Sequence, residues 1–409
     1  MNVLFLSISS LPHMSEHSIS LDLLREFQRN GHRVYVVCAI EKKENADTSF
    51  CEEAGISVLR VKTGNNKNTG LIEKGMTTLF LPNFYISAIK KYLNDVKFDL
   101  VLYPTPPVTH VKTVKFIKKR DGAKSYLLLK DIFPQNAVDI GMMTKWGVKG
   151  LIYRYFRKQE KELYRISDRI GCMSGANVDY VLKHNPEIDL EKVEISPNSI
   201  EYVDMRISDD GKNRMREKYG LPQDKKVYVY GGNLGRPQGI PFLIDCLRAE
   251  KDNKEAFFLI VGNGTEYGKL ETFVNEEKPD NVLLLKRLPK EDYDLLAASC
   301  DVGMIFLDHR FTIPNFPSRL LSYMQAGLPV IACTDPNTDV GRVIAEGGFG
   351  WWCESNDVKA FEAVVAESLK ADLKETGKNG HDFLKENYTV EKNYESIIDK
   401  FRVRNKVNG

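Results

Sequence analysis

Two arginines beside turns of the chain have the chemistry needed to hold a diphosphate. Arg236 follows the turn GGNLG, which begins at Gly231, and Arg319 follows Ser318 at the predicted start of a helix. A helix N-terminus offers unpaired N–H groups, and a guanidinium forms parallel hydrogen bonds with phosphate oxygens. Glycines let the backbone approach a ligand closely. We therefore expect both turns to bind one phosphate-bearing ligand, with ordinary strand-to-helix turns as the alternative.

Each of these turns joins a short apolar run to a helical segment, and this alternation continues along the chain. The predicted strands are 3–8, 33–39, 56–61, 100–103, 124–129, 169–173 and 193–195 in the first half, and 227–230, 257–261, 282–285, 302–306 and 330–332 in the second. Apolar strands separated by helices are typical of parallel sheets covered on both faces. The predicted fold class is α/β, with two Rossmann-like doubly wound domains facing across a cleft.

A polar stretch at 201–226 separates the two blocks and marks a domain boundary. We place an N-terminal domain at 1–200 and a C-terminal domain at 201–386. The remaining segment, 387–405, is predicted to be a helix that packs back on the first domain.

Composition excludes several other classes of protein. The 409 residues carry a net charge of +2, which gives no reason to expect nucleic-acid binding. The seven cysteines form no CxxC pair, and no His/Cys cluster has the spacing of a zinc site. The N-terminal apolar stretch lacks a basic region before it, and no window is long enough to span a membrane. We expect a cytoplasmic protein.

Four segments occur in an order and spacing that resemble the retaining glycosyltransferases of family 4, which have the GT-B fold. They are LLLKDIFPQNAVDIG at 127–141, MSGANVDYVL at 173–182, YGGNLGRPQGI at 230–240 and PNFPSRLLSYMQAGLPVIA at 314–332. The resemblance covers nearly the whole chain and is closest to the branch that acts in capsule, O-antigen and exopolysaccharide assembly. It implies sugar transfer with retention of configuration, the second domain holding a nucleotide-sugar and the first the acceptor.

The resemblance also implies which residues of the second domain hold the donor. Arg236 and Arg319 would neutralise the departing diphosphate, so that no metal cofactor is needed. The only DxD sequence, Asp292–Asp294, opens a predicted helix, where acids suit the dipole, and we interpret it as structural. Several of these positions have a structural alternative, such as a solvated loop arginine, a tight turn or a helix cap. The donor-binding candidates are Gly232, Asn233, Arg236, Gln238, Asn263, Leu288, Asn315, Ser318, Arg319 and Ser322.

This chain departs from the family pattern at the donor site. The family has two glutamates that contact the sugar and the ribose, and their places are taken by Pro314 and Ser322. Asn315 is expected to substitute for the first as a polar contact, and Ser322 would reach a ribose only weakly. Gln238 stands where a lysine is common.

The catalytic candidates are Lys130 and Asp131, which follow the predicted strand 124–129. Many members of the family have His-Asp at this corner, so Asp131 is expected near the acceptor hydroxyl as a base or a positioning group. A side-chain cap on the following turn is the alternative. The acceptor-binding candidates, which follow the first strand where the family has a glycine pair and which could instead form a helix-capping loop, are Ser15, Glu16 and His17.

The segment 145–169 has eight Lys/Arg against three acids, with aromatic residues such as Trp146 and Tyr155 among them. Basic residues beside amphipathic aromatics suit an anionic lipid surface. A core-facing helix with a basic outer side is the alternative. The segment 71–92 is predicted to form the opposite side of the acceptor opening, which favours a lipid-linked acceptor at the inner face of the membrane.

The leading hypothesis is a metal-independent, peripheral membrane glycosyltransferase that uses a nucleotide-diphosphate sugar, with uridine as the expected base. It would act on a lipid-linked glycan in surface polysaccharide synthesis. A nucleotide-sugar 2-epimerase of the same fold and a non-catalytic subunit of a membrane transferase are the rival hypotheses.

Overall fold

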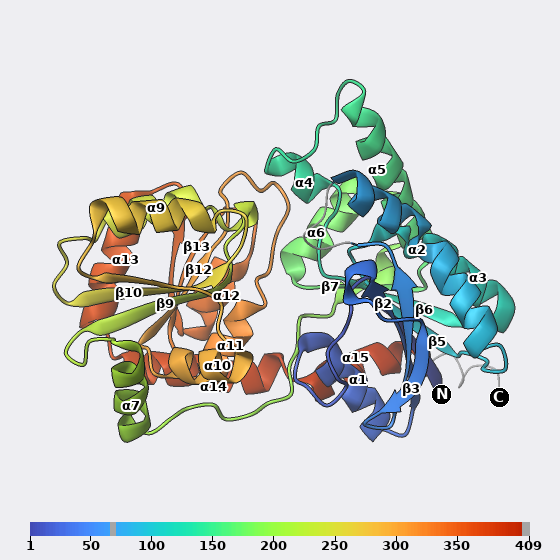
Figure 1. The fold of residues 1–409 in the computed structure, drawn as a ribbon, viewed down its shortest axis with the longest axis horizontal. Coiled ribbons are helices and arrows are strands. Elements are labelled where there is room, and N and C mark those ends of the chain that lie inside the picture. The colour runs from blue at the N-terminus through green and yellow to red at the C-terminus, as the bar shows by residue number, and fades with distance from the viewer. Residues whose placement is uncertain (66–70, 403–409) are drawn as a thin grey trace. The chain divides into compact units, whose positions relative to one another are not determined.

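Two separate, mainly parallel sheets organise the chain (Figure 1). Its structure is a computed structural model that describes residues 1–65 and 71–402. The chain divides into a first unit, Met1–Glu201 together with the chain from Val390 onward, and a second unit, Tyr202–Thr389. The sequence analysis placed the boundary between residues 200 and 201, one position earlier. The predicted fold class, an α/β chain with two doubly wound domains, is confirmed.

The first unit contains an eight-stranded sheet in the order β3-β4-β2-β1-β5-β6-β7-β8. Its strands are β1 (Asn2–Leu6), β2 (Arg33–Glu41), β3 (Ser49–Glu53), β4 (Ile56–Thr63), β5 (Leu100–Pro104), β6 (Lys124–Leu129), β7 (Arg169–Cys172) and β8 (Val193–Ile195). All pairings are parallel except that of β3 with β4. The sequence analysis missed β3, because this edge strand is largely exposed and carries no apolar run.

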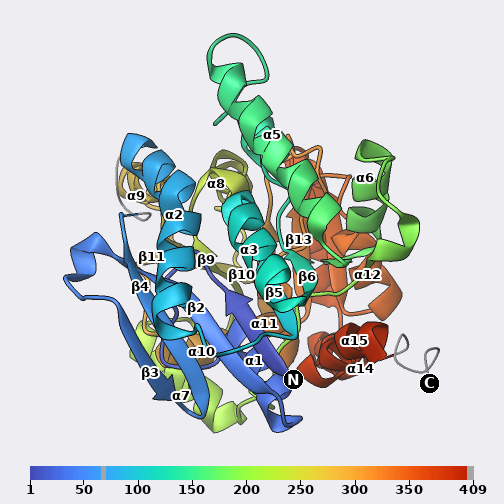
Figure 2. The ribbon, with the colours of Figure 1, turned by 90° about the vertical axis from the view of Figure 1, so that its right-hand side faces the viewer.

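Helices cover both faces of the first sheet. They are α1 (Ile19–Arg29), α2 (Leu71–Tyr92), α3 (Val111–Asp121), α4 (Gln135–Asp139), α5 (Lys149–Ile166), α6 (Gly175–His184) and α15 (Val390–Arg402). Figure 2 shows α2, α3 and α5 along one face. On the other face, α1 and α15 share one buried cluster with residues of β1 and β2.

The last helix, α15, packs against α1 of the first unit. The ring of Tyr394 meets Phe27 edge-on at 4.9 Å between centroids, and its hydroxyl lies 2.9 Å from Nε2 of His32. Residues 387–389, which the sequence analysis assigned to this helix, belong to the end of α14 (Leu373–Asn387) and the turn after it. Residues 403–405 of that prediction lie outside the described residues.

The second unit contains a six-stranded, all-parallel sheet in the order β11-β10-β9-β12-β13-β14. Its strands are β9 (Lys226–Asn233), β10 (Ala256–Asn263), β11 (Val282–Leu285), β12 (Val302–Phe306), β13 (Val330–Thr334) and β14 (Gly350–Glu354). The strand order reverses between β9 and β12, and ligands of doubly wound sheets bind at the carboxyl ends of strands near such a reversal. The sequence analysis missed β14, whose short run mixes buried and exposed residues.

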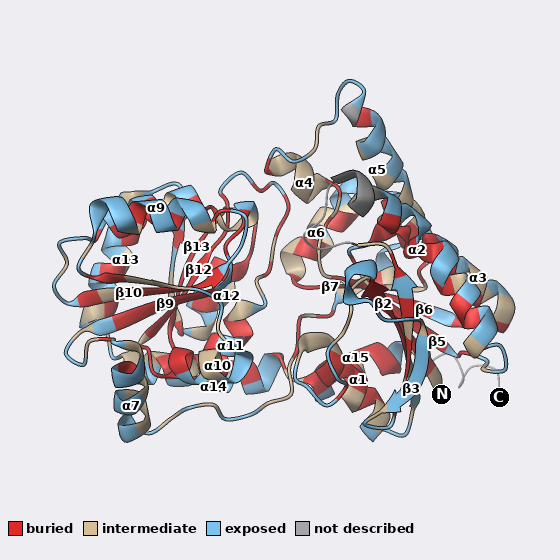
Figure 3. Cartoon of the chain, in the orientation of Figure 1, coloured by how far each residue is buried: buried red, intermediate tan, exposed pale blue. Residues whose placement is uncertain are grey.

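The helices of the second unit are α7 (Asp209–Tyr219), α8 (Ile240–Ala249), α9 (Tyr267–Glu277), α10 (Lys290–Ala298), α11 (Arg319–Gln325), α12 (Val340–Gly347), α13 (Val358–Lys370) and α14. One buried cluster joins α8, α9 and α13 to the sheet, while α10, α11, α12 and α14 pack on the other side. In Figure 3 the strands of both sheets are mainly buried and the helices expose their outer faces. None of the described helices combines the length and apolar composition that a bilayer crossing requires.

Candidate functional site

A pocket of about 440 Å³ lies at the carboxyl ends of β9 and β10 in the second unit. Its lining brings together four of the predicted donor-binding residues, which come from the ends of β9 and β10 and from the loop after β11. The lining residues are Gly232, Asn233, Val261, Gly262, Asn263, Arg287, Leu288, Lys290 and Tyr293. The pocket therefore stands next to the reversal of strand order, where a doubly wound sheet places its ligand.

Glycines allow the two turns at this edge to pack backbone against backbone. A Cβ on Gly262 would lie 2.0 Å from the carbonyl oxygen of Gly232, and one on Gly264 would lie 2.3 Å from that of Leu234. The N–H of Leu234 donates to the carbonyl oxygen of Asn263 at 2.9 Å. The floor of the pocket is thus fixed by main-chain contacts that larger residues would prevent.

Arg319 lies directly against the glycine turn at the end of β9. Its guanidinium stacks on the ring of Tyr230 at 4.3 Å from the centroid. A Cβ on Gly232 would lie 2.1 Å from Nη2 of Arg319, and Gly232 has a φ of 127°, a backbone conformation that side-chain-bearing residues rarely adopt. The absence of a side chain at Gly232 therefore leaves the space that the Arg319 guanidinium occupies.

Tyrosines surround the Arg319 guanidinium, and no carboxylate among the described residues pairs with it. Tyr323 is fully buried beneath the site, and its hydroxyl donates to the carbonyl oxygen of Val229 at 3.0 Å. The hydroxyl of Tyr293 is buried without a hydrogen-bond partner, and it would lie 1.9 Å from a Cβ on Gly231. Aromatic faces hold a cation in place without neutralising it. The arrangement leaves a positive charge available to an anion at the edge of the pocket.

Arg236 lies in a short 3-10 helix, Arg236–Gln238, that follows the same turn. Its side chain is 56% exposed, and its Nε lies 3.7 Å from Oε1 of Glu266. The Gln238 amide oxygen accepts hydrogen bonds from Asn233 Nδ2 at 3.0 Å and from the N–H of Gly235 at 3.2 Å. Gln238 and Asn233 thus brace the turn, while Arg236 extends from it into solvent.

The other donor candidates follow β12, around α11. Ser318 is exposed and makes no capping hydrogen bond, so the structural alternative of a side-chain cap is not observed, and α11 is only seven residues long. Ser322 is exposed on α11, and Pro314 is buried. The backbone oxygen of Asn315 accepts a hydrogen bond from Thr338 at 2.6 Å. Pro314 and Ser322, which take the places of the two family glutamates, therefore supply no carboxylate.

The DxD acids on α10 are paired with lysines. Asp292 Oδ1 lies 3.1 Å from Nζ of Lys218, and Asp294 Oδ2 lies 2.5 Å from Nζ of Lys290. The first contact joins α10 to α7 and the second lies within α10, which agrees with the structural interpretation of this sequence.

Lys130 and Asp131 lie just after β6, and burial shifts the pKa of both groups toward the neutral form. Burial raises the pKa of Asp131 to about 6 and lowers that of Lys130 to about 8. Oδ2 of Asp131 accepts a hydrogen bond from Asn136 at 2.6 Å, while Oδ1 has no partner. The pair has the properties of a proton-transfer site: a carboxylate that is ionised at neutral pH but close to titration.

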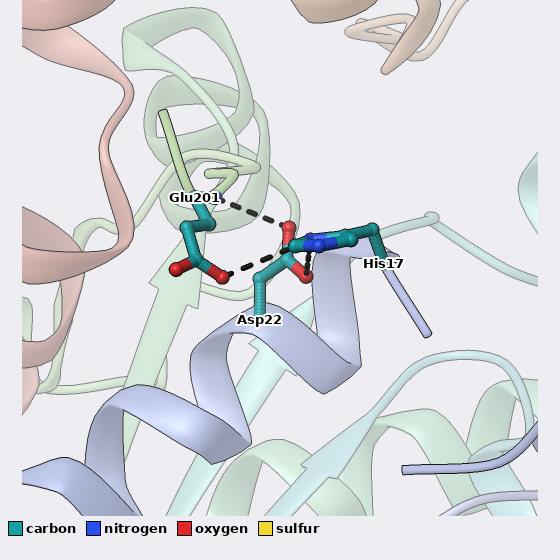
Figure 4. Close-up of side chains that lie close together, drawn as sticks. All are labelled: His17, Asp22 and Glu201. Carbon is teal, nitrogen blue, oxygen red and sulfur yellow. Dashed lines mark hydrogen bonds and ion pairs between the residues drawn. The ribbon is translucent and has the colours of Figure 1, made fainter. Parts of the chain in front are cut away.

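The predicted acceptor loop lies at the carboxyl end of β1. Ser15 Oγ lies 2.8 Å from Nδ1 of His13, and Glu16 is exposed. His17 belongs to a charged cluster with Asp22 of α1 and Glu201, the last residue of the first unit before the boundary (Figure 4). His17 Nδ1 lies 3.3 Å from Oδ1 of Asp22 and 3.7 Å from Oε2 of Glu201.

His17, Asp22 and Glu201 are residue types that bind metal ions, and their ligand atoms all lie within 4.8 Å of one another. Arg25 already supplies the positive charge there. Its Nη2 donates to Asp22 Oδ1 at 2.5 Å and lies 3.4 Å from Glu201 Oε2 and 3.1 Å from His17 Nδ1. The cluster thus ties the end of the first unit to α1, and the acceptor role of His17 stays a prediction.

The segment 145–169 forms the turn before α5 and the helix itself. Its exposed apolar side chains are Trp146 (82% exposed), Val148 (83%), Leu151, Ile152 and Tyr155. On α2, Phe80 and Phe84 are exposed, whereas Leu81 and Tyr85, which the sequence analysis assigned to the same opening, are fully buried. Both helices thus carry exposed apolar side chains, and Figure 2 shows α2 and α5 in the same layer of the first unit.

Sequence reasoning missed Tyr230 and Tyr293. Both read as ordinary positions, one in an apolar strand and one within the DxD sequence. The available signal was the pair Gly231–Gly232, which makes room for the Tyr293 hydroxyl and for Arg319.

Comparisons with known proteins relate this chain to glycosyltransferases. Residues 211–383 match the family model described as glycosyl transferases group 1. The chain is 26% identical over 337 residues to the probable glycosyltransferase WbjE of Pseudomonas aeruginosa, covering 80% of this chain and 79% of the relative. It is 22% identical to WcaI of Escherichia coli, named for colanic acid biosynthesis, over 71% and 72% of the two chains.

Solved structures show the same fold. A sucrose-phosphate synthase from Thermosynechococcus elongatus superimposes with a TM-score of 0.77 at 14% identity, covering 100% of both chains. HepE of Anabaena, solved in complex with UDP, gives a TM-score of 0.68 at 15% identity, covering 98% of this chain and 100% of its own. The predicted GT-B fold is confirmed, and so is the prediction of a glycosyltransferase. Family 4 and retention of configuration stay predictions.

Proposed function

We propose that this glycosyltransferase moves a sugar from a nucleoside-diphosphate donor, with uridine as the expected base, to a lipid-linked glycan. The supporting observation is Arg319, whose guanidinium lies against Gly232 with no acidic partner among the described residues. A diphosphate at this turn would provide the missing negative charge. HepE, which has the same fold, was solved with UDP.

The donor would occupy the pocket at the ends of β9 and β10. Arg319 and the more exposed Arg236 would stabilise the charge that develops on the diphosphate as the bond to the sugar breaks. Because fixed guanidinium groups can do this, we propose that the reaction needs no metal ion. Asn263 and Leu288, which line the pocket, would contact the nucleoside.

The acceptor would bind the first unit near Lys130 and Asp131. The unpartnered Oδ1 of Asp131 is the atom that would take the proton from the acceptor hydroxyl as the new bond to the sugar forms. With a pKa of about 6, this carboxylate is ionised at neutral pH and is a stronger base than an exposed aspartate. We propose retention of configuration and a role in surface polysaccharide synthesis; the name of the relative WcaI refers to colanic acid biosynthesis.

Donor binding and turnover in matched variants test the proposal. Arg319→Ala is expected to lower UDP affinity and sugar transfer by more than about tenfold, since a lost charge-assisted contact costs about 2 kcal/mol. Arg342→Ala is the control. Arg342 lies on α12 with its side chain 64% exposed, and its removal should change neither UDP affinity nor sugar transfer. Normal UDP binding and turnover in Arg319→Ala would remove this residue from the donor site.

The products distinguish the rival functions. Release of UDP that depends on a lipid-linked acceptor, together with a larger glycan by mass, supports transfer. A rearranged nucleotide-sugar formed without an acceptor would indicate an epimerase. Absence of nucleotide binding in the wild-type chain would favour a non-catalytic subunit.

A further inference from the structure

A basic groove of about 870 Å³ lies on the first unit between α3, α5 and the turn at 187–192. It is separate from the residues assigned above to the donor and to proton transfer. The charged residues that line it are Lys112, Lys115, Lys158, Lys161, Arg165 and Lys192 against Glu162, Glu187 and Asp189. The groove thus has an excess of positive charge, although the chain as a whole is nearly neutral.

Internal ion pairs account for only half of these cations. Glu162 pairs with Lys115 and with Arg165, and Glu187 pairs with Lys161 at 2.9 Å. In the part of the chain that the structure describes, no carboxylate pairs with the three other ammonium groups, which are those of Lys112, Lys158 and Lys192. Three unpaired cations around one groove predict an anionic occupant.

The groove continues directly into the exposed apolar end of α5. Residues at spacings of three and four share one side of a helix, and Leu151, Tyr155, Lys158, Glu162 and Arg165 follow this spacing. The side of α5 is therefore apolar over its first turns and basic where it enters the groove. Figure 2 shows the apolar end, with the loop before it, projecting beyond the sheet of the first unit.

We propose that this side of α5 docks on an anionic phospholipid bilayer and that the groove binds lipid phosphate headgroups. Trp146, Val148 and Leu151 would enter the interface, where aromatic and aliphatic side chains are favoured. The three unpaired lysines would lie at the level of the headgroups, where each contributes to electrostatic attraction. A protein partner without an acidic surface would explain the apolar end but not the cluster of unpaired cations next to it.

This docking would supply a lipid-linked acceptor to the first unit, and only that consequence rests on the proposed function. The binding itself needs neither donor nor glycan. A vesicle assay without substrates therefore tests the surface alone, and its failure would leave the donor-site proposal intact.

The test is co-sedimentation of the full chain with phosphatidylcholine vesicles that do or do not contain phosphatidylglycerol. The triple variant Lys112→Gln, Lys158→Gln, Lys192→Gln should lower the affinity for phosphatidylglycerol vesicles by about a hundredfold at low salt, because each lysine near the surface contributes about fivefold. The matched control, Lys254→Gln, Lys359→Gln, Lys374→Gln, removes three exposed lysines of the second unit and should bind as the wild type does.

Tryptophan fluorescence tests the apolar end. Vesicle binding should shift the Trp146 emission to shorter wavelength, and Trp146→Phe should remove the shift while Trp351 and Trp352 remain. Equal binding by the triple variant and the wild type would overturn the proposal. So would equal binding to vesicles without phosphatidylglycerol, binding to heparin but to no vesicle, or no vesicle binding at all.

Discussion

Asp131 and His110 are two titratable residues of the first unit that burial drives toward the neutral form. The pKa of Asp131 rises to about 6, and that of His110, which is fully buried, falls to about 3. Neither ring nitrogen of His110 has a hydrogen-bond partner, whereas Asp131 leaves one oxygen free. The two residues therefore make the stability of the first unit depend on pH in opposite directions.

Asp131→Asn is expected to stabilise the first unit while abolishing transfer. Because the folded pKa lies above that of a free aspartate, the contribution of Asp131 to stability is present below about pH 4 and is lost as pH rises through 6. At pH 7.5 the ionised group costs up to about 3 kcal/mol. Thermal unfolding should show a higher midpoint for the variant at pH 7.5 and nearly equal midpoints at pH 4. A lower midpoint at pH 7.5 would contradict the buried-carboxylate interpretation.

His110→Phe is expected to make the first unit more resistant to acid. A histidine whose pKa is depressed by folding binds a proton only after unfolding, so stability falls as pH drops below 6.5. At pH 5 this effect amounts to about 2 kcal/mol. The phenylalanine ring can keep the stacking on Tyr85, which lies 6.0 Å away between centroids. Urea unfolding at pH 5 and pH 7.5 measures the difference, and an unchanged pH dependence would show that another group causes it.

At the scale of elements, the turn after β9 joins a strand end to a helix and also gives Arg319 its position. The glycines of this turn and of the neighbouring turn at the end of β10 serve two different purposes. Gly262 and Gly264 let neighbouring turns approach each other, whereas Gly231 and Gly232 leave space for side chains of α10 and α11. The turn therefore couples the donor site to helices that are distant in sequence.

Gly232→Ala should impair donor use through this coupling. Its Cβ would lie 2.1 Å from Nη2 of Arg319, and its φ of 127° disfavours any side chain. We expect at least a tenfold loss in UDP affinity, comparable to that of Arg319→Ala. Gly268→Ala in α9 is the control, because nothing lies within 4 Å of its new Cβ. This substitution should raise the free energy of unfolding by about 0.5–1 kcal/mol. Isothermal titration with UDP checks both variants.

At the scale of the whole molecule, each unit has its own sheet and its own buried cluster. We expect calorimetry to resolve two unfolding transitions, since each core can melt by itself. UDP should raise only the transition of the second unit, because a ligand stabilises the unit that binds it. Asp131→Asn should move only the other transition. A single transition that both changes shift equally would show that the units unfold together.

The sequence by itself determined the two doubly wound sheets, because unbroken apolar strands such as 127–129 and the helices between them are local patterns. It also indicated the glycine turn and Arg319, since both lie in recognisable segments. It could not show that β3 and β14 complete the sheets, because neither has an apolar run long enough to stand out.

Only the tertiary structure decided what surrounds each charged group. Arg319 is held by Tyr230 and not by an acid, Asp131 is buried enough to shift its pKa, and His17 is tied to Asp22 and Glu201. Charge compensation and desolvation depend on neighbours that are close in space but distant in the chain. Residue spacing therefore identified the candidates, and their long-range contacts determined the chemistry available to each.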